Sequence, residues 1–571
     1  KVIAMLVKEL GISEETARKR VEKVSSIERV KTNVAKETGD AIRAYGLSGV
    51  KVDEDYKRYY PYGTLASKVL GFTGADNQGI LGLEVKYDEY LQGTNGKILT
   101  LTDARGIEIE NAGESRLEPV NGYDLCLSLD YNIQMYCEQA AKKVCTKKSA
   151  DSVSVIVMNP QNGELMAMVN YPEFDLNDPF TLVGDNGEAV SAEEKQNLLN
   201  KMWRNQCISD TYEPGSTFKI LTAYAPALDS GSYTLATTVL DEPITYSSGQ
   251  EIHNADGKYR GYTSIREAIQ DSVNVVAVKT VQDITPQAGY EMAKKFGIST
   301  LTKDDIVESL PLGVGGVTNL ELAAAFEVMP NQGVYKEPVM YTKILDQDGN
   351  VLLEKKPKKH RVINDSTAFL LTSAMQDVVL YGTGKLADFG TMPIAGKTGT
   401  AGTSEAARDA WFAGYTPYYT CVVWGGYDDY SRLESSRYPK ILWNHIMKQL
   451  HEGLAYKEFE MPEDVEVSSV CKTSGKVAIA GVCPETETEY FAEGTEPSEK
   501  CDLHQTAVIC KDSGLLAGEY CPESSKETKT FMKKGSGEDK MPTEVCNVHT
   551  GEGWLNQLIQ ALTPENNHTG Q

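Results

Sequence analysis

Residues 212–219 place a serine and a lysine one helical turn apart at the start of a predicted helix. The sequence there is YEPGSTFK, and an apolar periodicity continues after it, interrupted by Pro226. Because a Pro-Gly pair breaks the preceding structure, we expect Ser216 at the helix N-terminus and Lys219 on the same face. A desolvated lysine can activate a serine for nucleophilic attack. In the alternative interpretation Ser216 only caps the helix and Lys219 is solvated.

Two later motifs favour the catalytic interpretation. Residues 272–274 read Ser-Val-Asn and lie between two helical patterns, and residues 397–400 read Lys-Thr-Gly-Thr at the end of a strand-like run. Ser-x-x-Lys followed by Ser-x-Asn and Lys-Thr-Gly is the motif trio of serine β-lactamases and penicillin-binding proteins, with Asp usual at the middle position of the second motif. Val273 occupies that position here. The order, separation and local structure of the three motifs all fit.

Length and charge limit the functional classes. A chain of 571 residues exceeds one domain, and a formal net charge of -24 argues against binding to nucleic acids. No apolar run reaches the length of about 18 residues that a membrane-spanning helix needs. Because the chain begins with Lys1, we expect an ectodomain whose membrane anchor lies upstream of residue 1.

The pattern of elements predicts three regions and an α+β fold. Residues 1–149 alternate charged helical stretches with a Tyr- and Gly-rich mixed α/β segment. Residues 150–457 begin and end with strand-like hairpins, the second turning at Thr416-Pro417, with helical segments between them. This arrangement predicts an antiparallel sheet covered by helices. Residues 458–571 form a small Cys-rich tail that contains two imperfect repeats.

The 11 cysteines divide into two groups. Five are scattered in apolar contexts and are expected to be small core residues: Cys126, Cys137, Cys145, Cys207 and Cys421. In the tail each repeat supplies three cysteines and a histidine: Cys471, Cys483, Cys501 and His504, then Cys510, Cys521, Cys546 and His549. Three thiols and an imidazole suit a tetrahedral zinc site. Disulfides are the alternative, slightly preferred for an oxidising exterior.

With these motifs, residues 1 to about 455 resemble the high-molecular-weight penicillin-binding proteins, the D,D-transpeptidases that cross-link peptidoglycan. NQCISDTYEPGSTFK is similar to the nucleophile segment of class B members, and KRYYPYGTLASKVLGFTGADNQGILGLE to their N-terminal pedestal, or dimerisation-like, domain. Other segments, such as GVTNLELAAAFEVMPNQGVY and the Cys-rich tail, are more similar to clostridial class A sequences. The mixture leaves the subclass and the biological role, whether elongation, division or sporulation, open.

The resemblance implies a penicillin-binding and serine β-lactamase-like transpeptidase fold, and roles for the motif residues. Ser216 would be acylated by a stem peptide ending in D-Ala-D-Ala, with Lys219 as its base. Ser272 would relay a proton to the leaving amine, and Asn274 would hold the substrate amide and Lys219. Lys397, Thr398 and Thr400 would hold the terminal carboxylate, with Gly399 between them in the substrate strand. The backbone N–H groups of Ser216 and Thr400 would form the oxyanion hole.

The same resemblance implies partners and a location. Peptidoglycan stem peptides, a lipid-linked precursor and β-lactams would bind at the site, no cofactor would be needed for catalysis, and a membrane glycosyltransferase would act beside the enzyme. The protein would be anchored in the cell membrane by a single segment, facing outwards. Rival interpretations are a D,D-carboxypeptidase or β-lactamase with the same motifs, and a non-catalytic penicillin-binding sensor or scaffold.

Overall fold

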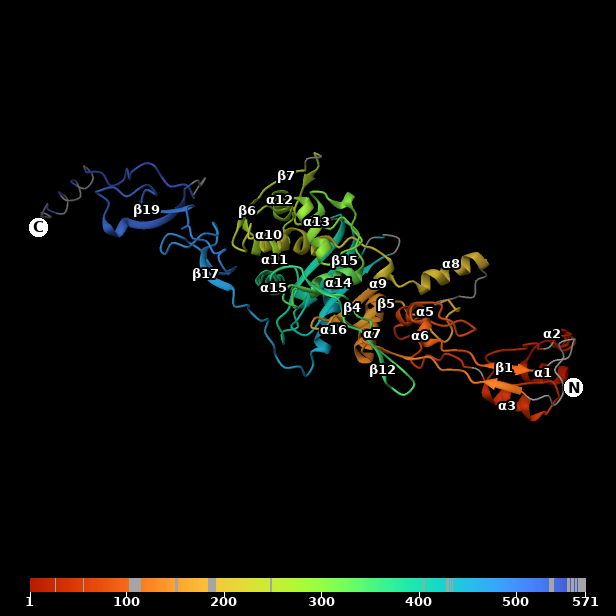
Figure 1. Cartoon of the computed structure of the whole chain (residues 1–571). Coiled ribbons are helices and arrows are strands. Elements are labelled where there is room, and N and C mark those ends of the chain that lie inside the picture. Colours follow the sequence, from red (N-terminus) through yellow and green to blue (C-terminus); the bar gives the residue numbers. More distant parts are fainter. Residues whose placement is uncertain are drawn as a thin grey trace, which may run out of the picture.

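The structure is a computed structural model with an elongated shape. Figure 1 shows the N-terminal helices at one end, a large mixed region in the middle and the Cys-rich tail at the other end. Within the part of the chain that it describes, every helix is too short or too polar to cross a bilayer. The described residues are 1–562 except 26, 55, 102–113, 149–151, 183–190, 247–248, 404–405, 428–430, 432, 434, 534–538, 552–554, 556–558 and 560–561. The predicted boundary between residues 149 and 150 lies outside them.

The described part of the N-terminal region consists of short helices, the strand pair β1–β2 and the strand β3. A small apolar cluster of Met5, Leu6, Ala17 and Ile42 joins its first three helices. Strand β3 leaves this region and pairs with β11 of the central region, which places residues more than two hundred positions apart side by side. The elements are α1 (Val2–Leu10), α2 (Glu14–Val21), α3 (Lys36–Ala44), α4 (Ser67–Leu70), α5 (Gly82–Lys86), α6 (Asp88–Leu91), β1 (Lys97–Thr100), β2 (Glu114–Leu117) and β3 (Asp124–Leu127).

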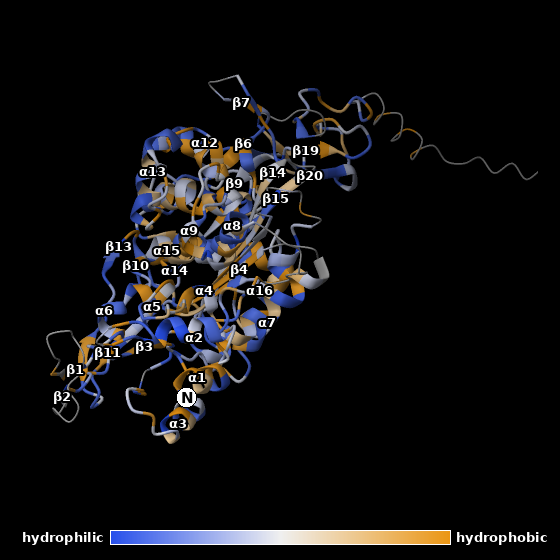
Figure 2. Cartoon of the chain, turned by 90° about the vertical axis from the view of Figure 1, so that its right-hand side faces the viewer, coloured by the Kyte–Doolittle hydropathy of each residue, from blue (hydrophilic) through white to orange (hydrophobic). Residues whose placement is uncertain are grey.

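A five-stranded antiparallel sheet forms the centre of the molecule, in the order β14-β15-β16-β4-β5. Successive residues of a strand face opposite sides of a sheet, so a strand that is apolar throughout can bury both faces. In β4, Val155 and Val157 pack with α7 and α16, whereas Ile156 and Met158 pack with the helices on the opposite face. Figure 2 shows apolar residues along β4 and the neighbouring helices. The five strands are β4 (Ser152–Asn159), β5 (Glu164–Tyr171), β14 (Ala395–Thr403), β15 (Ala406–Tyr415) and β16 (Thr420–Gly426).

Helices cover both faces of this sheet, which confirms the predicted fold class. On one side lie α7 (Tyr131–Lys148) and α16 (Tyr438–Leu450). The other side and its surroundings contain α8 (Ala192–Trp203), α9 (Gln206–Ser209), α10 (Ala225–Asp229), α11 (Ile265–Gln270), α12 (Asn274–Ile284), α13 (Pro286–Lys295), α14 (Asn319–Glu327) and α15 (Asp365–Leu380). Short pairings complete the region: β6 (Thr238–Asp241) with β9 (Gly261–Ser264), β7 (Ile244–Thr245) with β8 (Glu251–Ile252), β10 (Val334–Lys336) with β13 (Lys359–Arg361), and β11 (Tyr341–Leu345) with β12 (Val351–Glu354). Single 3₁₀ turns are η3 (Lys303–Asp305), η4 (Leu310–Leu312) and η5 (Lys385–Ala387).

Both predicted hairpins of the central region are present, and the predicted helix after Ser216 is irregular. Its first turn, η1 (Gly215–Thr217), is a 3₁₀ turn, and η2 (Ile220–Tyr224) is a π-helical turn that precedes α10. Pro226 has no N–H to donate, and its ring excludes the carbonyl four residues earlier, which accounts for the wider turn. Of the scattered cysteines, Cys137, Cys207 and Cys421 are fully buried, as expected for core residues.

The tail contains two similar hairpins, and the first lies against the central region. β17 (Val465–Cys471) pairs with β18 (Thr486–Ala492), and β19 (His504–Cys510) pairs with β20 (Lys526–Met532), which follows the turn η6 (Glu523–Ser525). Glu489 of β18 is fully buried and forms an ion pair of 2.6 Å with Arg266 of α11. The Arg266 guanidinium also pairs with Asp377 of α15 at 2.6 Å. These contacts fix the first hairpin to the helix that leads to Ser272.

Candidate active site

The segment that carries Ser216 is held between the sheet edge and a neighbouring turn. The indole N–H of Trp411 donates to the carbonyl of Glu213 at 2.9 Å, and the Thr217 hydroxyl donates to the carbonyl of Pro214 at 2.8 Å. Gly215 has a φ of +56°, and a Cβ there would lie 2.6 Å from the carbonyl oxygen of Thr400. Only glycine allows such a close approach. The half-buried Ser216 is thereby placed next to the backbone of β14.

Ser272 occupies a strained position at the end of α11. Its φ is +60°, in the left-handed region that non-glycine residues rarely adopt. The backbone N–H of Ser272 donates to the carbonyl of Ile269 at 3.3 Å, and the backbone N–H of Val273 donates to the carbonyl of Ala268 at 3.0 Å. These are the two hydrogen bonds of a Schellman motif. Glycine is usual at this position, so the serine there stores strain of a kind that is common at functional sites.

Two buried lysines converge on Ser272. The Lys219 ammonium donates to the Ser272 carbonyl at 2.6 Å, to its hydroxyl at 3.3 Å and to the Asn274 side-chain carbonyl at 2.7 Å. Lys397 of β14 donates to the same Ser272 hydroxyl at 2.8 Å. Both lysine side chains have no exposed surface. Residues from all three sequence motifs thus meet around one hydroxyl group.

Burial changes the protonation of both lysines. It lowers the pKa of Lys219 well below its ordinary value, and the nearby charge of Lys397 adds to the effect. Burial also lowers the pKa of Lys397, to about 7, with a further contribution from Lys440. Desolvation disfavours the ammonium form, and a second cation close by disfavours it further. The lowered pKa favours the neutral amine form of Lys219, which suits this residue to act as a base.

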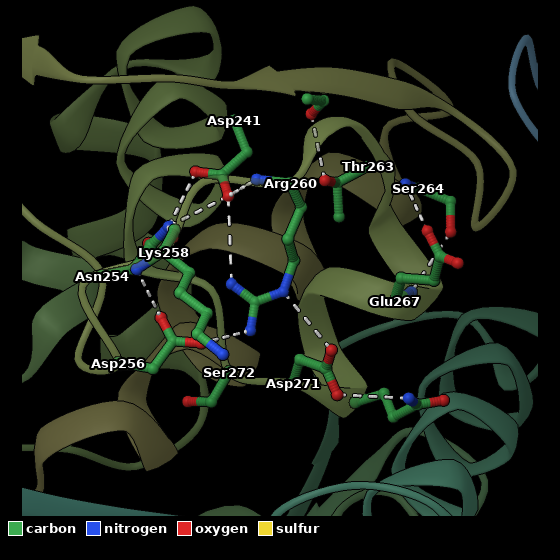
Figure 3. Close-up of polar contacts among 12 residues, drawn as sticks. Asp241, Asn254, Asp256, Lys258, Arg260, Thr263, Ser264, Glu267, Asp271 and Ser272 are labelled. Carbon is green, nitrogen blue, oxygen red and sulfur yellow. Dashed lines mark hydrogen bonds and ion pairs between the residues drawn. The ribbon is translucent and has the colours of Figure 1, made fainter.

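A polar network that the sequence motifs do not include supports Asn274. The side-chain carbonyl of Asn254 accepts the backbone N–H of Asn274 at 2.9 Å, and the Asn254 amide donates to Asp241 at 2.8 Å. Asp241 also accepts the N–H of Arg260 at 2.9 Å, and the Arg260 guanidinium lies 3.4 Å from Asp271, beside Ser272. Figure 3 shows the part of this network that links Asn254, Asp241, Arg260 and Asp271, with Ser272 beside it. It fixes the start of α12 relative to the end of α11.

The substrate-strand residues lie on the edge strand of the described sheet. In β14, Lys397 is paired with Ala413 and Thr400 with Ala410 of β15. Gly399 is buried against the carbonyl of Pro214, where a Cβ would lie 2.3 Å away. The hydroxyl of Thr398 is 2.9 Å from that of Thr383, and Lys440 donates to the Thr383 carbonyl at 3.3 Å. In a chain with a net charge of -24, the lysines Lys397 and Lys440 near one strand favour an anionic ligand.

Of the predicted site residues, the structure brings Lys219, Ser272, Asn274 and Lys397 into direct contact, and it adds others. Sequence reasoning missed Asp241, Asn254, Arg260, Thr383 and Lys440. None of them belongs to a short motif, because they come from separate strands, loops and helices that meet only in the folded chain. The sequence offered only Asn and Asp residues flanked by strand patterns as a signal, and this signal has little specificity for a functional site.

Replacement of Lys397 by methionine tests the cost of burying the lysine. The folded pKa is about 7 against 10.5 for an ordinary lysine, so the unfolded chain binds an extra proton between these values. Lys397 therefore lowers the free energy of unfolding most below pH 7, and this destabilisation becomes smaller as the pH rises towards 10.

We expect Lys397→Met to stabilise this domain by about 1–2 kcal/mol at pH 7, measured by urea unfolding. The wild-type chain should become more stable between pH 7 and 9, and the variant should show less of this increase. The exposed Lys385→Met should change stability by less than about 0.5 kcal/mol. A Lys397→Met chain that is less stable than the wild type would show that burial of this lysine does not destabilise the domain.

The tail residues also come together, in two groups of four. Cys471, Cys483, Cys501 and His504 form one group, and Cys510, Cys521, Cys546 and His549 form the other; within each, the potential ligand atoms all lie within 4.8 Å of one another. The six cysteines of these two groups are free thiols. Each group has a donor set that could hold a metal ion.

Family models match three parts of the chain, in agreement with this geometry. The penicillin binding protein transpeptidase domain matches residues 153–427, so the central sheet and its lysine pair belong to a transpeptidase domain. The penicillin-binding protein dimerisation domain matches residues 1–127. The C-terminal domain of penicillin-binding protein 1A matches twice, over residues 461–506 and 505–551. The chain belongs to the penicillin-binding proteins.

Similar proteins include members of both classes that the sequence resembles. Penicillin-binding protein 1A of Clostridium botulinum is 35% identical over 402 residues, which cover 67% of this chain and 45% of that protein. Stage V sporulation protein D of Bacillus subtilis is 30% identical over 417 residues, 69% of this chain and 62% of that protein. The chain thus spans less than two thirds of these relatives.

Solved structures share the fold. Penicillin-binding protein 3 of Mycobacterium tuberculosis, solved in complex with aztreonam, is 25% identical with a TM-score of 0.58, covering 71% of this chain and 92% of that one. A peptidoglycan synthetase from Bifidobacterium adolescentis has a TM-score of 0.61 at 21% identity, covering 79% of this chain and 84% of that one. At that identity the second likeness concerns the fold alone.

Proposed function

We propose that the chain is a peptidoglycan D,D-transpeptidase whose Ser216 is acylated by stem peptides ending in D-Ala-D-Ala. The observation that carries this proposal is the pair of buried lysines on Ser272, next to the turn with Ser216. A neutral Lys219 can accept a proton, whereas Lys397 near its pKa of about 7 can keep a charge for a carboxylate. The match to the transpeptidase domain supports the same reaction class.

In the proposed reaction, Ser216 Oγ forms a bond to the carbonyl carbon of the penultimate D-Ala while the C–N bond to the terminal D-Ala breaks. The hydroxyl proton passes to Lys219 and, through Ser272, to the leaving amine. An acceptor amine then attacks the acyl carbon, which restores Ser216 and leaves a new amide. The Ser216 and Thr400 backbone N–H groups would stabilise the oxyanion, an interaction worth about 3 kcal/mol for one donor.

The proposed substrate would lie along β14 as an added strand. β14 is the edge strand of the described five-stranded sheet, and an extended peptide can pair with an edge. Lys397, with the hydroxyls of Thr398 and Thr400, would then hold the terminal carboxylate. β-Lactams would acylate Ser216 as analogues of this terminus. No cofactor enters the proposed reaction.

The expectations about location and partners stay predictions. Because peptidoglycan lies outside the cytoplasmic membrane, the proposed reaction requires this chain to face outwards from the cell membrane. An anchor upstream of residue 1, the lipid-linked precursor as substrate source and a membrane glycosyltransferase partner follow from the sequence resemblance.

The experiment that tests the function is acyl transfer to an amine. The 571-residue chain is incubated with a peptide ending in D-Ala-D-Ala and a D-amino acid as acceptor, and the products are identified by mass spectrometry. We expect release of D-Ala together with the exchanged peptide. Hydrolysis without exchange would show a carboxypeptidase, and rapid turnover of benzylpenicillin would show a β-lactamase. A stable penicilloyl adduct without either product would favour the sensor or scaffold.

A further inference from the structure

We infer that the tail holds two structural zinc ions, each bound by three cysteine thiolates and one histidine. The first site consists of Cys471, Cys483, Cys501 and His504, and the second of Cys510, Cys521, Cys546 and His549. Neither site takes part in the proposed transpeptidase reaction. The inference rests on the geometry of the ligand atoms, on the repetition of the site and on the composition of the core around it.

The distances between ligand atoms agree with tetrahedral coordination. Zn–S bonds of about 2.3 Å and Zn–N bonds of about 2.0–2.1 Å at tetrahedral angles separate a sulfur and a nitrogen ligand by about 3.5 Å. In the first site His504 Nδ1 lies 3.4 Å from the Sγ atoms of both Cys471 and Cys501. In the second site His549 Nδ1 lies 3.3 Å from Cys510 Sγ and 3.6 Å from Cys546 Sγ. The same nitrogen, Nδ1, faces the sulfurs in both sites.

The two sites are built in the same way. In each hairpin the first cysteine ends a strand and its carbonyl accepts the N–H of a glycine four residues later, Gly475 or Gly514, at 2.8 Å. The third cysteine and the histidine follow in Cys-x-x-His spacing, although more residues separate the second cysteine from the third in the second repeat. The same four types of ligand come together in both modules although the loops differ in length. The ligand set, and not the loop length, is therefore the feature that the two modules share.

Groups around the ligands have the contacts expected of a metal site. The backbone N–H of Ile479 donates to Cys483 Sγ at 3.3 Å, and that of Gly518 donates to Cys521 Sγ at the same distance. Such bonds stabilise negative charge on sulfur. In the second site the other ring nitrogen of His549 lies 3.5 Å from the Asp512 carboxylate. A carboxylate in this position orients a histidine ligand and makes it more basic.

In the described part of the second module few apolar side chains are buried apart from the ligands, with Ile509 and Phe531 the largest of them. Its buried cluster consists of Cys510, Cys521 and Cys546, with Ala517 packed against it. Small domains with so little buried apolar surface usually need a metal or disulfides to fold. One disulfide per module would leave a third buried thiol beside a histidine, whereas a zinc ion uses all four groups. Binding of a structural zinc supplies folding free energy directly.

The first site also connects the two modules. His504 is the last ligand of the first site and the first residue of β19, the opening strand of the second module. The first module in turn contacts the transpeptidase domain through the Glu489–Arg266 ion pair. Zinc in the first site would therefore fix the position at which the second module begins.

Metal analysis of the full chain tests the inference. Protein purified without chelators or added metal should contain about two zinc ions per chain. Cys483→Ser and Cys521→Ser should each retain about one, and the control Cys126→Ser, which changes a cysteine outside both sites, should retain about two. After denaturation with a chelator, all 11 cysteines should react as free thiols. Zinc-free protein, another metal in place of zinc, or fewer reactive thiols because of disulfides would overturn the inference.

Cobalt substitution provides a second measurement if a variant fails to fold. Zinc is removed from the wild-type chain by a chelator under reducing conditions, and Co²⁺ is added in steps. We expect thiolate-to-cobalt charge-transfer and tetrahedral d–d absorption that saturate at about two equivalents. Absence of these bands in refolded protein would contradict a thiolate site. Penicillin acylation of the same samples is measured separately, so a failed zinc site and a failed transpeptidase proposal are distinguishable.

Discussion

Ser216→Ala is expected to abolish covalent labelling by benzylpenicillin. In the proposed reaction the Ser216 hydroxyl supplies the atom that bonds to the acyl group, and no other group takes its place. The loss should be complete within detection, in contrast to the partial losses caused by replacement of supporting residues. Intact-mass spectrometry over several hours measures the effect, with one penicilloyl adduct expected on the wild-type chain and none on the variant.

A matched control separates chemistry from folding. Ser209 is an exposed serine shortly before the same segment, and Ser209→Ala should label like the wild type. The thermal unfolding of Ser216→Ala should also be close to that of the wild type, because the hydroxyl is only half-buried. Labelling that persists in Ser216→Ala would refute Ser216 as the nucleophile.

Lys219→Ala is expected to slow acylation by about 10²–10⁴-fold, the usual contribution of a positioned general base. Ser216 is retained in this variant, so the adduct should still form, but slowly. The change also removes three hydrogen bonds to Ser272 and Asn274, which loosens the turn between α11 and α12. Stopped-flow measurement of acylation by a chromogenic β-lactam gives the rate constant for both chains.

The pH dependence of acylation separates a base from a residue that only holds the turn in place. Burial lowers the pKa of Lys219, so in the wild type the neutral base is lost as the pH falls through that lowered pKa. Acylation should therefore slow on the acidic side, and this slope should be absent from Lys219→Ala. The control Lys258→Ala removes an exposed lysine next to the same network and should leave the rate and the slope unchanged (Figure 3). A slope that is retained in Lys219→Ala would assign the base to another group.

The sequence by itself indicated most of the local elements and the protein family. Two strand-like runs around a turn predicted the first hairpin, and apolar alternation about Thr416-Pro417 predicted the second, because strand patterns depend on neighbours only a few positions away. The structure places these hairpins at residues 152–171 and 406–426. The three motifs pointed to Lys219, Ser272 and Lys397, which the structure brings together. The tail repeats pointed to the cysteines and histidines that the structure gathers into two groups of four, since Cys-x-x-His spacing is a local property. The sequence left zinc and disulfides open because both use the same cysteines.

Other features depend on segments far apart in the chain, and only the tertiary structure decided them. The pairing of β3 with β11 joins regions that the sequence pattern separates. Asn254 and Asp241 support Asn274 through contacts that no short motif records. The left-handed conformation of Ser272 follows from how α11 and α12 pack, and not from a residue preference, since serine disfavours it.

The two buried lysines show most clearly why the protonation of the site depends on the tertiary structure. Lys219 and Lys397 are separated by most of the transpeptidase domain in sequence, and each is an ordinary lysine when considered alone. Folding removes both from water, which lowers the pKa of each, and the charge of a neighbouring lysine, Lys397 for Lys219 and Lys440 for Lys397, lowers it further. The sequence specified which groups are present, whereas burial and proximity, which arise only when the sheet and helices assemble, decided how those groups bind protons.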